Sequence, residues 1–223
     1  MEILLDTANI EQIKKYMALY QVVGVTTNPT IISREKAEFW PLLKEIKGII
    51  GDKQLHVQVT ADTWEEMVKE AECIRKRLGN DTYIKVPVNE QGVCAMKHLK
   101  EMGAKVTATA VYSVQQAMLA ASVGADYMAP YFNRMNNLSM DSKKVIAEIA
   151  ELYKTHNQST KILAASFKNT EQVIDSFKVG AHAVTVSVDL LTTMVKNAII
   201  DFAVDGFKND WVSLYGNKKI YEL

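Results

Sequence analysis

The sequence predicts an α/β fold, a single (β/α)8 barrel with an extra helix at the C-terminus. Short apolar runs alternate eight times with segments of helical periodicity, as the units of such a barrel do. The tripeptides that begin at Gly103, Gly124 and Gly180 each join a helix end to a strand, since glycine accepts the left-handed conformation that ends many helices. No linker or change of composition interrupts the 223 residues, so residues 1–223 are expected to form one domain.

The strands are predicted where β-branched and apolar residues run together and stop at a polar or turn residue. In chain order they cover residues 3–5, 22–26, 55–59, 82–88, 105–111, 127–130, 161–165 and 183–188. The segment 131–140 follows the sixth strand and is expected to be a longer connection.

The helices are predicted from apolar residues at helical spacing, from terminal glycines, and from capping residues. The predicted caps include Thr63, Asn89, Ser113 paired with Gln116, and Asn169 paired with Gln172. The helices are expected at residues 10–20, 37–50, 62–79, 89–103, 113–124, 141–154, 169–180, 189–196 and 198–215. A doubly wound open sheet is the alternative arrangement of these elements. That fold favours a phosphate-binding pair of glycines, and the sequence contains no Gly-x-Gly, so the barrel is the better prediction.

Composition excludes several classes of function. The 26 basic and 26 acidic residues balance, so neither a nucleic acid nor an acidic membrane surface is an expected partner. The two cysteines, Cys73 and Cys94, lie in helical segments without a Cys-x-x-Cys motif, which favours a reducing compartment. The first six residues do not resemble a signal peptide, and the longest uncharged run, 106–125, is too polar for a membrane span. We therefore expect a soluble cytoplasmic protein.

One lysine interrupts the apolar run 82–88. Lys85 lies between Ile84 and Val86, and Pro87 ends the strand. Burying an ammonium group is costly unless it is paired, so a buried lysine tends to lose its proton. A neutral amine on a rigid strand can form a Schiff base with a carbonyl compound. The alternative, which is commoner for a strand lysine, is an edge strand whose lysine points into solvent.

Polar residues follow the neighbouring strands, at the ends where barrel enzymes carry their chemistry. Seven consecutive strands deliver such a group, namely Asp6, Thr26 and Asn28, Gln58, Lys85, Thr109, Tyr131, and Ser166 with Lys168. Each of them alone is explained as a loop residue or a helix cap. Because they occur in series around a lysine inside a strand, the sequence favours a functional Lys85.

Metal chemistry and hydrolysis by a Ser-His-Asp triad are less well supported by the sequence than amine catalysis. The histidines, His56, His98, His156 and His182, show none of the usual metal-ligand spacings, and no Gly-x-Ser-x-Gly elbow is present. His56 shares a strand face with Gln58 and is expected to be a core or pocket-wall histidine. Metal-free amine catalysis is the chemistry that fits best.

Six segments together resemble the transaldolase family, in particular its small-subunit branch, which includes the fructose-6-phosphate aldolases. They are Leu-Asp-Thr at 5–7, Gly-Val-Thr-Thr-Asn-Pro-Thr at 24–30, Ile-Lys-Val-Pro at 84–87, Thr-Ala-Val-Tyr at 109–112, Ala-Pro-Tyr-Phe-Asn-Arg at 129–134 and Leu-Ala-Ala-Ser-Phe-Lys at 163–168. They extend over most of the chain in the family's order. The resemblance implies a class I mechanism that uses no metal and no cofactor, with sugar phosphates and small ketones such as dihydroxyacetone as substrates.

The resemblance also implies roles for residues around the imine. Lys85 would be the nucleophile, Asp6 would orient it and assist proton transfer, and Thr26 and Asn28 would bind the lysine and the donor hydroxyls.

Further roles concern water and phosphate. Gln58, Thr109 and Tyr131 would hold a catalytic water and perform acid–base work, whereas Arg134 and Ser166 would bind the phosphate of the acceptor aldehyde. Arginine suits phosphate because its planar fork can meet two oxygens.

Two residues favour one branch of the family. Transaldolases usually have glutamate at the position of Gln58 and phenylalanine at that of Tyr131. A phenol can protonate the enamine and release free dihydroxyacetone, so we expect reversible cleavage of fructose 6-phosphate to dihydroxyacetone and glyceraldehyde 3-phosphate. A transaldolase that passes the three-carbon unit to a second sugar phosphate is the alternative. A barrel that binds sugar phosphates without turnover is a third possibility, which the intact set of site residues disfavours.

Two further features distinguish the chain. His56 and Thr107 are expected to face inward, where apolar residues are usual, which bears on the choice of donor. The resemblance implies a homo-oligomer, a pentamer or a pair of stacked pentamers, whose terminal helix packs on a neighbour. Residues 198–223 are expected to make that contact through Trp211, Leu214 and the residues beside them, the alternative being packing within the subunit.

Overall fold

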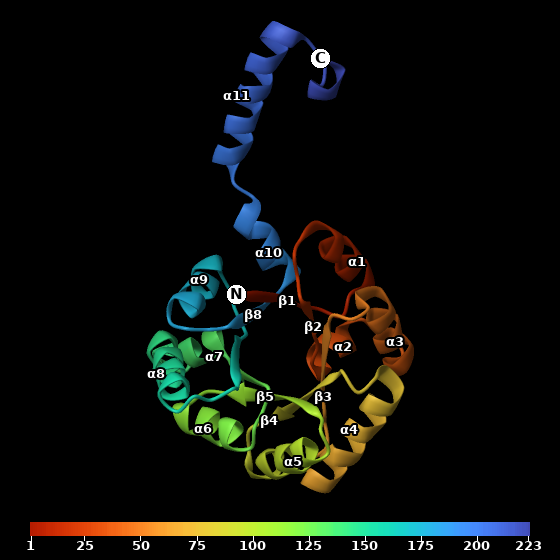
Figure 1. Cartoon of the computed structure of the whole chain (residues 1–223), viewed down its shortest axis with the longest axis vertical. Coiled ribbons are helices and arrows are strands. Elements are labelled where there is room, and N and C mark those ends of the chain that lie inside the picture. Colours follow the sequence, from red (N-terminus) through yellow and green to blue (C-terminus); the bar gives the residue numbers. More distant parts are fainter.

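The computed structural model describes residues 1–223 and contains a closed barrel of eight parallel strands, which confirms the predicted fold class. The strands follow chain order around the barrel, and the eighth pairs with the first. They are β1 (Glu2–Asp6), β2 (Gly24–Thr26), β3 (Gln54–Gln58), β4 (Tyr83–Pro87), β5 (Lys105–Val111), β6 (Tyr127–Pro130), β7 (Lys161–Ala164) and β8 (Ala183–Val186). Helices surround the barrel on the outside, as Figure 1 shows.

The helices include two that the sequence analysis did not predict. In chain order they are α1 (Ile10–Leu19), α2 (Pro29–Arg34), α3 (Phe39–Ile50), α4 (Trp64–Leu78), α5 (Glu90–Glu101), α6 (Val114–Ser122), α7 (Phe132–Asn137), α8 (Ser142–Thr155), α9 (Thr170–Lys178), α10 (Val188–Val195) and α11 (Ala198–Tyr215), followed by a 3₁₀ turn at Ile220–Glu222. The short helices α2 and α7 lie where loops were expected. Asn28 caps α2 through a hydrogen bond from the Ile31 amide, and Pro29 occupies its first position, a recognisable start signal.

Local sequence explains most of the other helix ends. Thr63, Asn89, Ser113 and Asn169 each accept a backbone hydrogen bond as the N-cap of the following helix, as predicted. The three junction glycines have positive φ values of 67°, 74° and 106°, which confirms the left-handed conformation inferred from the repeated tripeptides. The eighth strand is shorter than predicted because Ser187 caps α10.

The barrel interior contains both apolar and polar side chains. Leu4, Tyr127, Leu163 and Ala183 form a small buried cluster inside the barrel, whereas outward residues such as Ile84 pack in the main core with the helices. Buried polar side chains lie inside the barrel too, at Thr26, His56, Lys85, Thr107, Thr109 and Thr185. Because side chains alternate along a strand, the outward packing of Ile84 and Val86 turns Lys85 inward.

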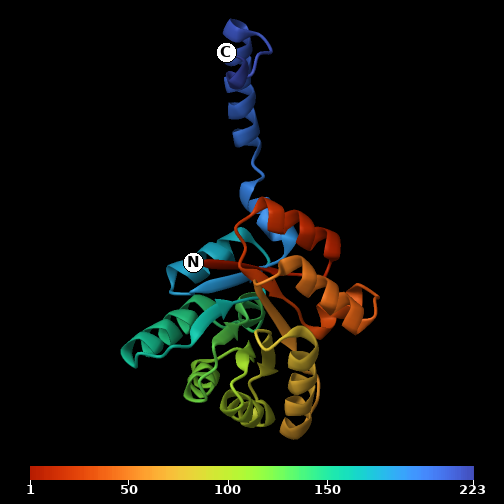
Figure 2. The same ribbon diagram turned by 45° about the vertical axis from the view of Figure 1, so that its right-hand side comes forward.

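Helix α11 stands away from the barrel. Figures 1 and 2 show it extending beyond α10 in both views, far from the strands. Its large apolar side chains are solvent-exposed in the single chain, for example Phe202 (81%), Phe207 (71%) and Leu214 (74%). The predicted helix is therefore present, and it presents apolar surface that its own barrel does not cover. None of the helices combines the length and the apolar character that a membrane crossing requires.

Candidate active site

A cavity of about 110 Å³ opens at the C-terminal ends of the strands. Eight of the nine predicted site residues line it: Asp6, Thr26, Asn28, Lys85, Thr109, Tyr131, Arg134 and Ser166. Thr107 and Thr185 contribute further hydroxyl groups, and Ala129, Leu163 and Ala165 complete the wall. The barrel therefore brings together side chains that are spread over most of the sequence.

Lys85 lies at the centre of β4, and its residue is only 5% exposed. Its Nζ donates a hydrogen bond of 2.7 Å to the carbonyl oxygen of Thr27. Burial lowers the pKa of Lys85, and the charge of Asp6 opposes this effect without cancelling it. The arrangement raises the neutral fraction of an amine that is already fixed in position.

Helix α5 packs closely behind the end of this strand. A Cβ atom on Gly92 would lie 1.8 Å from the carbonyl oxygen of Pro87, so only glycine allows the helix to begin so near to β4. The close fit helps to hold the Lys85 strand rigid from the outside.

Asp6 ends β1 and belongs to a chain of hydroxyl contacts. The Thr26 hydroxyl donates to its Oδ1 at 2.8 Å, and Thr185 lies 2.6 Å from the Thr26 oxygen. Since the Thr26 proton points at Asp6, the Thr185 hydroxyl donates to Thr26. Burial raises the pKa of Asp6, although the charge of Lys85 and the hydrogen bond from Thr26 act in the opposite direction. A carboxyl group with a raised pKa is suited to moving protons near neutral pH.

Thr109 and Tyr131 meet at the other side of the cavity. Their oxygens are 2.8 Å apart. Burial raises the pKa of Tyr131, and the hydrogen bond to Thr109 and the charge of Arg134 only partly oppose this effect. The phenol is therefore protonated at neutral pH and available as a proton donor.

A β-bulge lies beside Thr109. The register between β5 and β6 shifts between Ala108 and Val111, and Ala110 has a positive φ of 56°. Gln116 braces the bulge, since its Nε2 donates to the carbonyl oxygens of Val88 at 2.9 Å and Ala110 at 3.3 Å. Strained backbone of this kind is concentrated at functional sites, where surrounding contacts hold it in place.

Arg134 and Ser166 lie at the outer end of the cavity. The guanidinium of Arg134 sits 4.8 Å from the centroid of the Tyr131 ring and donates to the Tyr112 phenol at 3.4 Å. Ser166 also has a left-handed backbone, with φ of 63°. This cation and this hydroxyl group can hold an anionic group at the cavity mouth.

The cavity mouth is held together by residues that were not predicted from the sequence. The backbone N–H of Asn133 donates a hydrogen bond of 2.8 Å to the backbone carbonyl oxygen of Ser166. Gln172 donates to Asn133 Oδ1 at 3.0 Å and accepts from the Lys168 amide at 2.8 Å, so it ties the loop after β7 to α7. Asn169 and Gln172 were expected only as a capping pair. The cap is present, but the partner across the loop is not visible from local spacing.

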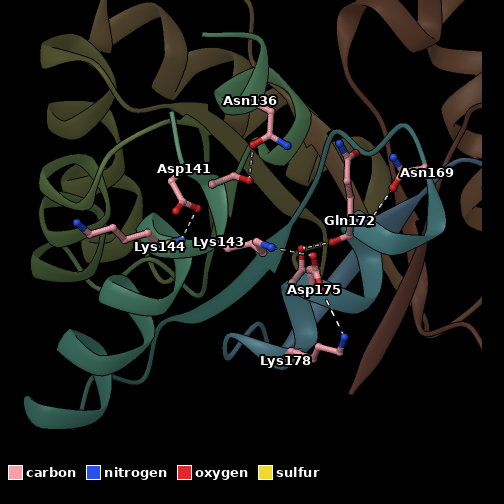
Figure 3. Close-up of polar contacts among 10 residues, drawn as sticks. Asn136, Asp141, Lys143, Lys144, Asn169, Gln172, Asp175 and Lys178 are labelled. Atoms are coloured by element: carbon pink, nitrogen blue, oxygen red, sulfur yellow. Dashed lines mark hydrogen bonds and ion pairs between the residues drawn. The ribbon is translucent and has the colours of Figure 1, made fainter. Parts of the chain in front are cut away.

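Figure 3 shows the helix ends behind this loop. Asn169 caps α9 at Gln172, and Asp175 of α9 faces Lys143 of α8, with their charged atoms 3.5 Å apart. Lys178 approaches the same carboxylate at 3.6 Å. Ion pairs with such exposed lysines contribute little stability, so packing is the main connection between α8 and α9.

Asn28 and Gln58 are placed differently from the rest. Asn28 lines the cavity, while its Oδ1 caps α2. Gln58 pairs in register with Lys85, yet it lines a neighbouring, more apolar pocket of about 420 Å³ with Phe39 and Trp40. The role of Gln58 in holding water stays a prediction.

Thr107 and Thr185 also line the cavity; Thr107 was predicted only to face inward and to bear on the choice of donor, and Thr185 was not predicted. Both are buried threonines inside apolar strands, in the runs Val106 to Ala108 and Val184 to Val186. A polar group that interrupts an apolar strand is the signal that would have identified Thr185, as it identified Lys85.

Comparison with known proteins gives consistent results. The family model described as transaldolase/fructose-6-phosphate aldolase matches residues 3–217. A Streptococcus pneumoniae protein named probable fructose-6-phosphate aldolase is 44% identical over 222 residues, which are 99% of this chain and 100% of the relative.

Two solved structures share the barrel at low identity. One is a Pediococcus acidilactici protein described as a lactate oxidase (TM-score 0.61, 11% identity, 83% of this chain) and the other is a flavocytochrome b2 mutant (TM-score 0.60, 10% identity, 84% of this chain). The chain spans 62% and 56% of their respective lengths. At such identity the likeness concerns the fold alone.

Proposed function

Because this chain belongs to the transaldolase/fructose-6-phosphate aldolase family, we propose that it is a class I aldolase that forms an imine on Lys85. The proposed reaction is the reversible cleavage of fructose 6-phosphate to dihydroxyacetone and glyceraldehyde 3-phosphate. The observation that carries the proposal is the buried Lys85 amine, whose pKa is lowered, in a cavity shared with Asp6 and Tyr131.

Imine formation requires a neutral amine and a source of protons. The Lys85 nitrogen attacks the ketone carbon, and the resulting carbinolamine loses water to give the iminium ion. Asp6 is suited to give a proton to the departing hydroxyl group, because burial raises the pKa of its carboxyl group. The positive charge of the iminium is then opposed by the Asp6 carboxylate.

Cleavage moves electrons from the sugar into this iminium. When the C3–C4 bond breaks, its electron pair neutralises the iminium and gives an enamine, while the C4 hydroxyl group loses its proton and becomes the aldehyde. The hydrogen-bonded pair of Thr109 and Tyr131 supports the proton transfers, directly or through water. Protonation of the enamine carbon and hydrolysis of the imine release dihydroxyacetone and restore Lys85.

The phosphate group is assigned to the outer end of the cavity. Arg134 comes from α7 and Ser166 from the loop after β7, and Gln172 fixes these two segments relative to each other. A phosphate there would place the aldehyde half of the sugar away from Lys85 and the ketone half beside it.

A transaldolase is the alternative within the same family. The two reactions share the imine and differ in the fate of the enamine, which is protonated in the aldolase and captured by a second aldehyde in the transferase. The Tyr131 phenol, protonated and 2.8 Å from Thr109, supports the aldolase because it can serve the protonation.

Two measurements test the proposal. Borohydride reduction in the presence of dihydroxyacetone, followed by peptide mass spectrometry, is expected to give an adduct on Lys85. An adduct on a different lysine, or none, would contradict the mechanism. Incubation with fructose 6-phosphate alone is expected to release dihydroxyacetone steadily, whereas turnover only after addition of erythrose 4-phosphate would identify a transaldolase.

We also propose that α11 mediates a homo-oligomer, a pentamer or a pair of stacked pentamers. The exposed Phe202, Phe207 and Leu214 support this assembly, since several large apolar side chains on one helix are unfavourable in water. Light scattering on the full chain and on a chain that ends at residue 197 tests it. A full chain that elutes as a monomer would rule it out. The cytoplasmic location stays a prediction, supported by the free cysteines Cys73 and Cys94.

A further inference from the structure

A chain of hydrogen bonds runs through the barrel interior from the cavity to the opposite end. The Thr107 hydroxyl lies 2.9 Å from Nδ1 of His56, and Nε2 of His56 lies 3.1 Å from Oε1 of Gln54. Gln54 donates to the Tyr127 phenol oxygen at 3.2 Å, and this phenol donates to Glu2 at 2.6 Å. Barrel interiors are filled mainly by branched aliphatic side chains, so a continuous polar chain needs a reason.

The Glu2 end fixes the direction of these hydrogen bonds. Burial acts to raise the pKa of Glu2, but hydrogen bonds from Lys161 and Tyr127 outweigh it, so the pKa lies below its ordinary value. The ionised carboxylate only accepts, and Lys161 donates to it at 2.7 Å. Tyr127 must therefore direct its one proton at Glu2 and accept from the Gln54 amide nitrogen. The carbonyl oxygen of Gln54 is left to face His56.

The tautomer of the His56 ring determines the direction of its hydrogen bond with Thr107. The ring is neutral, because burial and the charge of Lys85 hold the pKa of His56 well below its ordinary value. Since Gln54 Oε1 only accepts, the ring proton resides on Nε2, and Nδ1 accepts from the Thr107 hydroxyl. The Thr107 proton is thereby committed to His56. Its oxygen retains lone pairs and can act toward the cavity only as an acceptor.

We propose that Thr107 is a specificity-determining residue that accepts a hydrogen bond from a hydroxyl group of the ketone donor. Thr107 pairs in register with Lys85 and lines the same cavity. A donor hydroxyl group brings a proton to this oxygen, whereas the methyl group of a deoxygenated donor brings none. A buried acceptor left unpaired costs binding free energy, so the pocket selects the hydroxylated donor. The inference rests on the proposed function, because it takes the donor to be bound as an imine on Lys85.

The test compares dihydroxyacetone with hydroxyacetone as donors, with glyceraldehyde 3-phosphate as the acceptor. The readout is the ratio of kcat/KM for the two donors, measured on the same sample so that the folded fraction cancels. Thr107→Val keeps the shape and removes the hydroxyl group, and we expect the preference for dihydroxyacetone to fall by about 5-fold. Thr107→Ser is expected to retain most of the preference. Thr160→Val, the same change at a buried threonine outside the cavity, is the control.

A second variant tests the orientation by His56. His56→Phe keeps an aromatic ring against Tyr83, whose ring centroid lies 4.4 Å from that of His56, but leaves the Thr107 proton free to turn toward the cavity. The donor ratio is expected to fall in this variant although Thr107 is intact. An unchanged ratio would overturn the part assigned to His56.

The outcomes separate the inference from the proposed function. If Thr107→Val keeps the wild-type ratio and borohydride still traps both donors on Lys85, the inference is wrong and the aldolase mechanism stands. If the wild-type protein traps neither donor on Lys85, the proposed function fails and the inference fails with it. A fall of the ratio in Thr107→Val and in His56→Phe, with no change in Thr160→Val, supports both.

Discussion

The side chains of Lys85 and Asp6 share one buried cavity, and the charge of each opposes the effect of burial on the pKa of the other. Burial alone favours a neutral amine and a neutral acid. The attraction between the ammonium and the carboxylate favours the ionised pair. A pair in which these effects compete can exchange a proton at low cost, which suits a cycle that alternates between a free amine and a charged iminium.

Asp6→Asn tests this coupling. Without the carboxylate the pKa of Lys85 should fall further, because the charge that raises it is gone. The amine attacks in its neutral form, so kcat/KM rises as the pH rises through this pKa, and the acidic limb of the profile should move to lower pH. Loss of the proton-transfer group should lower kcat by about 100-fold. An acidic limb that stays in place or moves to higher pH would show that Asp6 does not act on Lys85, and Asp52→Asn, at an exposed turn, is the control.

Tyr131→Phe tests the fate of the enamine. Removal of the phenol leaves the Thr109 hydroxyl without its partner and takes away the protonated donor. Release of dihydroxyacetone from fructose 6-phosphate should fall by about 100-fold, while transfer to erythrose 4-phosphate should fall much less. The ratio of the two rates is the measurement. Tyr153→Phe removes a buried phenol that binds the Ala117 carbonyl and should leave the ratio unchanged.

The barrel was predictable from sequence because its signals are local. Apolar runs, N-caps and glycines with positive φ mark the ends of most elements. Two strands, β5 (Lys105–Val111) and β6 (Tyr127–Pro130), have the bounds that were predicted for them. The short helices α2 and α7 were missed because six-residue helices carry too little periodicity to be recognised. The position of α11 relative to the barrel could not be predicted from local sequence either. The apolar residues of this helix indicate only that some surface covers them, without indicating which one.

The candidate site was predictable as far as it consists of strand ends. Closure of the barrel places such ends around one cavity, which is why residues as distant as Asp6 and Ser166 meet there. Contacts between side chains of different elements could not be predicted in this way. The Gln172 bridge to Asn133 and the orientation of Thr107 by His56 depend on side-chain directions that register and packing determine, and no spacing in the sequence encodes them.

Arg134→Met tests the phosphate end of the cavity. The side-chain stem stays beside the Tyr131 ring, but the charged hydrogen-bond donors are lost. Hydrogen bonds to charged groups are strong, so KM for fructose 6-phosphate should rise by about 10- to 100-fold. Addition of dihydroxyacetone to unphosphorylated glyceraldehyde should change little, which separates loss of phosphate binding from general damage. Lys144→Met, at an exposed lysine of α8, is the control, and an equal effect on both acceptors would place the phosphate elsewhere.

His56 provides a prediction about stability. The pKa of His56 is well below its ordinary value in the folded protein because of burial, and in the unfolded chain the ring regains a pKa of about 6.5. Between these two values the unfolded state binds one more proton than the folded state, so stability is full above about pH 6.5 and is lost as the pH falls below it. The loss per buried neutral histidine is about 1.4 kcal/mol per pH unit.

His56→Phe should remove this contribution from the acid side of the stability curve. Urea unfolding of the wild type at about pH 7.5 and about pH 5.5 should show a drop in the free energy of unfolding that exceeds the drop in the variant by about 1 kcal/mol. Comparison of differences is needed because His182, whose pKa is also lowered by burial, and the carboxyl groups titrate in both proteins. Equal pH dependence in the two proteins would mean that His56 accepts a proton in the folded state. In that case the ring would donate from Nδ1 to the Thr107 oxygen, and the Thr107 proton would be free to point into the cavity.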